Sequence, residues 1–175
     1  MKTNKVIFLD RDGVINKEKN YLYKIEDFQF IDGVFDSLYY LTSLGYKLII
    51  VSNQSGIGRG FYSINQFNKL NEWMLEKFSR NNISFLDVLI CPHTDEDNCN
   101  CRKPKPGLII DSAKKYEIDL LDSFLIGDSE RDIIAAKKSG IKTTILVRSG
   151  HKIDEKNTQA NFVIDSIKDI NEIIR

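Results

Sequence analysis

The sequence has few cysteines, prolines and histidines, and those few are crowded together. Of 175 residues, three are cysteine, three are proline and two are histidine. All the cysteines, all the prolines and one histidine lie in residues 91–107, which read CPHTDEDNCNCRKPKPG. Three cysteines cannot all pair with one another, and Cys99 and Cys101 are too close for an ordinary disulfide framework. We therefore do not expect a secreted disulfide-rich domain, and we expect reduced thiols that act as ligands.

An excess of charge of one sign is also missing, and so are long hydrophobic runs. Lys plus Arg and Asp plus Glu number 25 each, so the formal net charge is zero. No overall field attracts nucleic acid or an anionic membrane, although local basic patches are compatible with this balance. The four apolar residues before Asp10 are too few for a signal peptide, and no later run is long enough to span a bilayer. We expect a cytoplasmic protein with neither a nucleic-acid nor a membrane partner.

The chain alternates short apolar runs with stretches of helical periodicity. With 42% hydrophobic residues it can bury one good core, so residues 1–175 are predicted to form one domain. We predict strands over 5–10, 47–52, 86–91, 123–128, 143–147 and 161–164. We predict helices over 34–44, from the Ser63 and Gln66 capping box onward, and over 107–117, 129–139 and 166–174. Strands that are apolar throughout, each followed by a helix, predict a doubly wound (Rossmann-like) α/β fold with a mostly parallel sheet and helices on both faces.

Polar residues follow several predicted strands at their carboxyl ends, where ligands bind in doubly wound folds. Asp10 and Asp12 follow the first strand, Ser52 ends the second, and Asp128 ends the fourth. Two carboxylates as close as the first pair repel each other and suit Mg²⁺. Each pattern also has an ordinary explanation, such as carboxylates that cap a turn. Their occurrence in order at successive strand ends favours one active site.

Four motifs carry a resemblance to a known family. DRDG at 10–13, Ser52, Lys103 and GDSERD at 127–132 resemble, in order, the motifs of the haloacid dehalogenase superfamily of aspartate-nucleophile phosphatases. FLDRDGVIN, SNQSGIGRG and the cysteine loop are similar to the branch that contains the heptose bisphosphate phosphatases and the related histidinol-phosphatase domains. The chain departs from the commoner pattern in having five residues between His93 and Cys99, and in having Ser52 where threonine is usual.

The resemblance implies a set of catalytic and Mg²⁺-binding residues. Asp10 would be the nucleophile, Asp12 the general acid and base, and Ser52 and Lys103 the residues that hold the phosphoryl group. Mg²⁺ would be held by Asp10, Asp128 and the backbone carbonyl of Asp12.

The resemblance also implies a substrate site, and Asp132 would orient Lys103 or a metal-bound water. The predicted substrate-binding residues are Glu18, Lys19, Asn20, Tyr21, Ser52, Asn53, Gln54, Ser55, Arg102 and Lys103. No separate cap domain is expected, so the pocket should be open. We leave His151 as a surface residue and assign no role to Arg59.

The cysteine loop supplies three thiolates and an imidazole from Cys91, His93, Cys99 and Cys101. This Cys₃His set suits a tetrahedral, structural Zn²⁺ site, and its spacing is not that of a zinc finger. The alternative is a group of unrelated free thiols. Zinc would fix the loop directly before Arg102 and Lys103.

The resemblance predicts a Mg²⁺-dependent phosphomonoesterase that works through an aspartyl phosphate. The expected substrate is heptose 1,7-bisphosphate, hydrolysed at the 7-phosphate in nucleotide-heptose synthesis for surface polysaccharide, by an enzyme expected to be a monomer. The alternative within the same class is a histidinol-phosphate phosphatase. A phospho-receiver signalling domain is the alternative from another class, but its phospho-accepting aspartate would follow the third strand, where this chain has Cys91.

Overall fold

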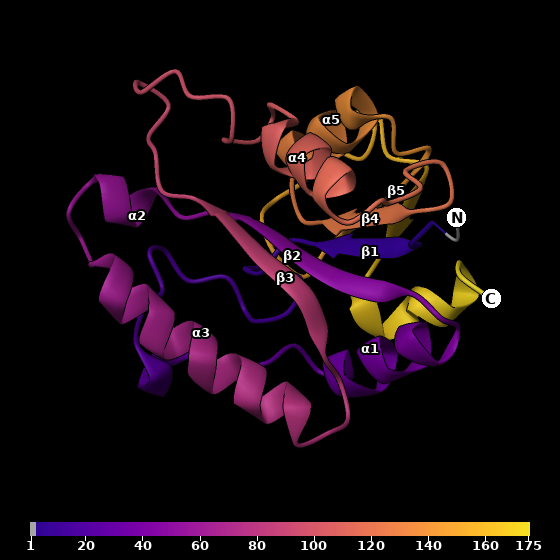
Figure 1. Cartoon of the computed structure of the whole chain (residues 1–175), viewed down its shortest axis with the longest axis horizontal. Coiled ribbons are helices and arrows are strands. Elements are labelled where there is room, and N and C mark those ends of the chain that lie inside the picture. The colour runs from indigo at the N-terminus through magenta and orange to yellow at the C-terminus, as the bar shows by residue number, and fades with distance from the viewer. Residues whose placement is uncertain (1–2) are drawn as a thin grey trace.

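The computed structural model describes residues 3–175 and has one six-stranded parallel sheet at its centre (Figure 1). The strands are β1 (Val6–Leu9), β2 (Lys47–Asn53), β3 (Phe85–Cys91), β4 (Phe124–Gly127), β5 (Thr143–Val147) and β6 (Phe162–Ile164). Their order is β3-β2-β1-β4-β5-β6, with every neighbouring pair parallel. This is the order of the doubly wound fold, and it differs from the 2-1-3-4-5 order of receiver domains. The predicted fold class is confirmed.

Helices cover both faces of the sheet. They are α1 (Val34–Ser43), α2 (Ser55–Gly58), α3 (Ile64–Ser79), α4 (Gly107–Lys115) and α5 (Glu130–Ser139), with 3-10 helices η1 (Ile25–Asp27) and η2 (Ile167–Glu172). In Figure 1, α4 and α5 lie on one side of the sheet, and α1, α3 and η2 lie on the other. Helix α3 begins with the predicted capping box, in which Ser63 and Gln66 bond to each other's backbone N–H groups.

Each strand contributes to two hydrophobic cores, one on each face. In β1, Ile7 and Leu9 pack in the core under α1 and α3, whereas Val6 and Phe8 pack in the core under α4 and α5. Because both faces are buried, a polar residue at any of these positions would be costly, which explains why the strands read as continuous apolar runs. Each fully buried side chain of this kind contributes about 1.5–3 kcal/mol.

The structure differs from the prediction at two helices. The predicted helix over 166–174 is the 3-10 helix η2, whose buried Ile167 and Ile170 are three residues apart and so lie on one side of a three-residue turn. The single turn α2 was not predicted because four residues are too few to show a period.

Two long connections meet at the carboxyl-terminal edge of the sheet, namely residues 10–33 after β1 and residues 92–106 after β3. The second, which we call the thiol loop, rises beyond α2 in Figure 1 before it returns to α4. These connections carry only η1 and isolated bridges, so no cap domain covers this edge in the part of the chain that the structure describes. Within residues 3–175, none of the helices is both long enough and apolar enough to cross a membrane.

Candidate active site

A pocket of about 440 Å³ lies at this edge and is lined by every residue predicted for catalysis, substrate binding or Mg²⁺. The predicted residues in its lining are Asp10, Asp12, Glu18, Lys19, Asn20, Tyr21, Ser52, Asn53, Gln54, Ser55, Arg102, Lys103, Asp128 and Asp132. They come from the ends of three strands and from both long connections, which the parallel sheet brings together. Their roles stay predictions, but their convergence is a property of the fold.

Asp10 lies beside Lys103 at the bottom of the pocket. Asp10 Oδ1 accepts a hydrogen bond of 2.8 Å from the backbone N–H of Arg11 and lies 3.2 Å from Lys103 Nζ. Among the described residues, no hydrogen bond reaches Asp10 Oδ2. Burial raises the pKa of Asp10 well above its usual value, and the nearby Asp132 and Asp128 add to this, while Lys103 opposes it. A second cation would therefore favour the ionised, nucleophilic form.

Lys103 is buried and held from three sides. Its ammonium donates to the carbonyl of Val51 at 2.7 Å and lies 2.5 Å from Asp132 Oδ1. Burial alone would lower the pKa of Lys103. The carboxylates of Asp10 and Asp132 raise it by more than burial lowers it, so the net shift of the pKa is upward. Lys103 is therefore a fixed positive charge next to Asp10.

The backbone of Lys103 is tied to the end of β2 by Asn53. The side-chain amide of Asn53 donates to the carbonyl of Lys103 and accepts from its N–H, at 3.1 and 3.0 Å. Asn53 was predicted to bind substrate, yet both ends of its amide are engaged in placing the lysine. The thiol loop is thus tied to the end of β2 at Lys103, the residue predicted to hold the phosphoryl group.

Asp132 and Asp128 lie next to Asp10 and Lys103 in the lining. Asp132 Oδ2 accepts from the backbone N–H groups of Asp128 and Ser129, at 3.2 and 3.1 Å, and from the Ser129 hydroxyl. Since its other oxygen contacts Lys103, Asp132 is fully used as a positioning residue. Burial raises the pKa of Asp128. Asp10, Asp128 and Asp132 offer oxygens that all lie within 4.8 Å of one another.

Two glycines make room for Asp128. A Cβ on Gly13 would lie 2.3 Å from Asp128 Oδ2, and one on Gly150 would lie 2.0 Å from the same atom. Gly13 also has a φ of 85°, which favours glycine. The DRDG motif therefore needs its glycine both for the turn and for the carboxylate that faces it.

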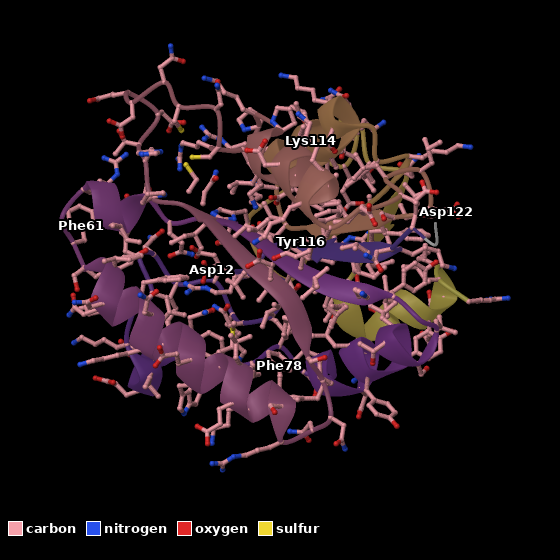
Figure 2. The ribbon with its side chains drawn as sticks, viewed as in Figure 1. Asp12, Phe61, Phe78, Lys114, Tyr116 and Asp122 are labelled. Atoms are coloured by element: carbon pink, nitrogen blue, oxygen red, sulfur yellow. The ribbon has the colours of Figure 1, made fainter. Side chains whose placement is uncertain are left out.

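Asp12 is held by three side chains. Its oxygens accept from Arg11 Nη2 at 3.0 and 3.1 Å, from Asn16 Nδ2 at 2.9 Å and from Gln54 Nε2 at 3.0 Å. Gln54 also donates to Ser52 Oγ at 2.8 Å and accepts from the hydroxyl of Tyr62. In Figure 2, Asp12 lies on the same side of the molecule as α2 and the thiol loop. Gln54, predicted to bind substrate, thus links Asp12 with the phosphate-binding candidate Ser52.

Arg11 was not predicted and is almost completely buried, with 1% of its side chain exposed. Its Nη2 also donates to the carbonyl of Leu22, in the connection that bears Glu18 to Tyr21. A buried guanidinium is costly unless it is paired, so the ion pair with Asp12 and the contact with this connection offset part of its desolvation. The sequence shows that Arg11 stands between Asp10 and Asp12, but it gave no signal that its side chain is buried rather than solvated.

His151 lines the pocket and contacts Asp128, although the sequence analysis left it as a surface residue. Its Nδ1 lies 2.6 Å from Asp128 Oδ2, and its backbone N–H donates to the same oxygen at 3.0 Å. Burial lowers the pKa of His151, but the hydrogen bond and charge of Asp128 raise it by more. The expectation was incomplete: 57% of the side chain is exposed, but its ring is oriented by a buried carboxylate. The remaining unpredicted lining residues are Leu22, Gly56, Tyr62, Ser129, Glu130 and Arg131.

Cys91, at the end of β3, comes together with His93, Cys99 and Cys101 of the thiol loop, and Figure 2 shows sulfur atoms gathered near this loop. Cys99 Sγ lies 3.5 Å from the sulfur atoms of Cys91 and Cys101, and His93 Nδ1 lies 3.6 Å from Cys91 Sγ and 3.2 Å from Cys101 Sγ. These sulfur separations are far longer than a disulfide of about 2.05 Å. They suit the edges of a tetrahedron around Zn²⁺, given a Zn–S length of about 2.3 Å and a Zn–N length of about 2.0–2.1 Å. The cluster could therefore hold a metal ion.

The sequence and the fold are similar to those of known phosphatases. Residues 100–170 match the HAD-hydrolase-like family model. The chain is 42% identical to D-glycero-beta-D-manno-heptose-1,7-bisphosphate 7-phosphatase of Pasteurella multocida, over 98% of this chain and 97% of that one. It is 44% identical to the D-glycero-alpha-D-manno-heptose-1,7-bisphosphate 7-phosphatase of Photorhabdus laumondii, over 89% of each.

A solved structure agrees with the computed one over nearly the whole chain. It is the D,D-heptose 1,7-bisphosphate phosphatase from B. bronchiseptica, crystallised with magnesium and phosphate. The two share a TM-score of 0.84 and 29% identity, and the match covers 96% of each chain.

Proposed function

The chain belongs to the heptose-1,7-bisphosphate 7-phosphatase family of the haloacid dehalogenase superfamily, and from this premise we propose that it removes the 7-phosphate of D-glycero-D-manno-heptose 1,7-bisphosphate. The observation that carries the proposal is the placement of Asp10 against Lys103 and Asp128 in a pocket at the carboxyl-terminal edge of the sheet. The product would serve nucleotide-heptose synthesis for surface polysaccharide.

Mg²⁺ fits the carboxylates at this edge. Burial raises the pKa values of Asp10 and Asp128, so a cation bound between them would favour their ionised forms. Asp10, Asp128 and the backbone carbonyl of Asp12 would hold the ion. When bound, it neutralises charge on the nucleophile and on the phosphate.

Asp10 would act as the nucleophile through Oδ2, the oxygen without a hydrogen bond among the described residues. The O–P bond to Asp10 forms as the bond from phosphorus to the leaving alkoxide breaks, and Asp12 gives the alkoxide its proton. Asp12 then takes a proton from water as that water attacks phosphorus, which breaks the aspartyl phosphate and restores Asp10. Arg11, Asn16 and Gln54 hold the Asp12 carboxylate in place for both steps.

Lys103 and Ser52 would bind the oxygens of the transferred phosphoryl group, where charge is greatest in the transition state. Lys103 already lies 3.2 Å from Asp10, and its position is fixed by Asn53 and Asp132. The anomeric phosphate of the same substrate would lie farther out, and Arg102 is the proposed residue for it because its planar fork suits phosphate.

Cys91 at the end of β3 and His93, Cys99 and Cys101 of the thiol loop would bind Zn²⁺. Three thiolates and an imidazole close a tetrahedron without an open position, so this metal would be structural. It would fix the backbone next to Arg102 and Lys103, where the loop has no regular secondary structure.

Phosphate release by the purified protein tests the proposed function. The substrates are the alpha and beta anomers of heptose 1,7-bisphosphate and histidinol phosphate, and Asp10→Asn gives the background. We expect kcat/KM for at least one heptose bisphosphate to exceed that for histidinol phosphate by about tenfold or more. A preference for histidinol phosphate would make the alternative correct and the heptose assignment wrong.

A further inference from the structure

Arg131 shares a carboxylate with Arg102 at the rim of the pocket. Arg102 donates to Asp95 through Nε at 2.9 Å and through Nη2 at 3.2 Å, in the two-pronged geometry typical of an arginine and a carboxylate. Arg131, in the first turn of α5, donates through Nη1 to Asp95 Oδ1, also at 2.9 Å. Both arginines line the pocket, so one loop carboxylate fixes two guanidinium groups on the same wall.

The shared oxygen sets the spacing of the two arginines. Arg102 Nε and Arg131 Nη1 each lie 2.9 Å from Asp95 Oδ1, so they cannot be farther apart than twice this distance. A phosphate, which offers several acceptor oxygens, can bridge donors at such a spacing. Among the bonds of the described residues, Arg131 donates only through Nη1, so its other N–H groups stay available.

The position of the two arginines follows from their neighbours in the chain. Arg102 directly precedes Lys103 in the chain, and Arg131 directly precedes Asp132. Lys103 and Asp132 form the ion pair of 2.5 Å that bounds the reacting site. Arg102 and Arg131 are thus each one residue along the chain from a group of the reacting site, and both bond Asp95 of the thiol loop.

The connection after β1 adds Glu18 and Lys19 to the lining, one charge of each sign. Glu130 also lines the pocket, but its carboxylate accepts hydrogen bonds from Thr158 and Gln159, so the two arginines form the stronger cationic group at the rim.

The charge of the group favours an anion as well. Hydrogen bonds from Arg102 and Arg131 hold the pKa of Asp95 well below its usual value, so this carboxylate stays ionised near neutral pH. Two guanidinium groups and one carboxylate leave one net positive charge. A surface ion pair by itself contributes little to stability, so the pairing with Asp95 does not explain why two arginines face the same pocket.

We propose that Arg131, together with Arg102, binds the phosphate of the substrate that is not hydrolysed, and that Asp95 is a positioning residue for both. The inference rests on the proposed function, since it supposes a substrate with two phosphates. It adds a residue from α5 to a site otherwise built from the thiol loop. An exposed side chain of α5 thereby becomes a determinant of substrate choice.

The test compares two substrates that differ only in the second phosphate, heptose 1,7-bisphosphate and heptose 7-phosphate. The measured quantity is the ratio of their kcat/KM values in the wild type, in Arg131→Ala and in Arg131→Lys. We expect Arg131→Ala to lower this ratio about tenfold, and Arg131→Lys to lower it less because the charge stays while the fork is lost. Arg80→Ala is the matched control, because Arg80 is also an exposed arginine in an ion pair, with Glu76, but lies outside the pocket lining.

An unchanged ratio in Arg131→Ala would overturn the inference. If the ratio is unchanged because kcat/KM falls equally for both substrates, Arg131 acts on the loop or on the reacting phosphate. Thermal unfolding of the variants checks the loop directly. The proposed function fails on a different result, namely a wild type that hydrolyses histidinol phosphate faster than either heptose phosphate. The ratio can be measured in that case too, because it uses the same two substrates whichever one is fastest.

Discussion

The pocket joins two regions that are held in place by different means. At the carboxylate edge, defined by Asp10, Asp128 and Asp132, strand register and ion pairs with Lys103 of the thiol loop place the groups. In the thiol loop, residues 92–106, no strand or helix is present, and the loop is held by side chains such as Lys105, which donates to the carbonyl of Cys99 at 2.8 Å. The edge therefore owes its geometry to the core, whereas the loop owes its geometry to hydrogen bonds of its side chains and, in our proposal, to a metal held by its thiols.

The difference implies that the two regions fail in different ways. A change at the carboxylate edge should remove chemistry and leave the fold intact, because the strands beneath are packed in two hydrophobic cores. A change in the thiol loop should loosen the positions of Arg102 and Lys103 and reduce stability.

The largest effect is expected at the nucleophile. Asp10→Asn should lower kcat/KM by about 10³-fold or more, because an amide neither attacks phosphorus nor binds Mg²⁺ well. The fold should survive, since the neutral amide replaces a carboxyl group whose neutral form burial already favours. The measurement is phosphate release together with thermal unfolding. Asp122→Asn, an exposed aspartate, is the control. Normal turnover by Asp10→Asn would refute the mechanism.

A smaller effect is expected at Arg102, where the two regions meet. Arg102→Ala should cost about 2–3 kcal/mol in kcat/KM for heptose 1,7-bisphosphate, because the guanidinium N–H groups proposed to bind the second phosphate are lost. The cost for p-nitrophenyl phosphate should be smaller, since this substrate does not extend to Arg102. Steady-state kinetics with both substrates provide the check. An equal loss for both would mean that Arg102 serves the reacting phosphate.

The metal ligands of the thiol loop come next. Protein purified without added metal should contain about one zinc per chain, and Cys99→Ser should lose it. The variant should unfold at a temperature lower by roughly 5–10 °C, which corresponds to about 2–3 kcal/mol, and its activity should fall about tenfold as Lys103 loses its fixed position.

Hydrogen bonds from neighbouring groups make Cys99 a suitable position to test. Burial raises the pKa of its thiol, but hydrogen bonds, the largest from Cys101, bring the pKa down to about 6. Elemental analysis and calorimetry are the measurements, and Glu96→Gln in the same loop is the control. A zinc-free protein with full activity would mean that these are unrelated thiols.

The strands and the identity of the site could be predicted because they depend on local patterns. Each predicted strand agrees with the observed one to within one or two residues, since residues buried on both sides are apolar without interruption. Asp10 and Asp128 could be placed together because parallel strands end at one edge.

The side-chain pairs of the pocket could not be predicted from the sequence. Asp95 and Arg131 are 36 residues apart, and Asp128 and His151 are 23 residues apart. Such pairs depend on how the loops pack at the rim, and the pattern of the chain carries no signal for this. For the same reason the burial of Arg11 between two aspartates became visible only in the structure.

The smallest expected effect is a pH-dependent stabilisation by Mg²⁺, which should depend on the carboxylate edge and not on the thiol loop. Burial raises the pKa values of Asp10 and Asp128, so the folded, metal-free protein binds protons more tightly than the unfolded chain. As pH rises from the ordinary aspartate pKa through these raised values, the metal-free protein must accept buried negative charge and loses stability. Mg²⁺ binds the ionised carboxylates, so its stabilising effect should grow over the same range.

We expect millimolar Mg²⁺ to raise the unfolding temperature by about 5 °C at about pH 7.5, and by less at about pH 5. Asp10→Asn should lose most of this gain, whereas Cys99→Ser should keep it, because the thiol loop contributes no Mg²⁺ ligand. A gain that is independent of pH, or one that disappears in Cys99→Ser, would mean that the two regions are not separate metal sites.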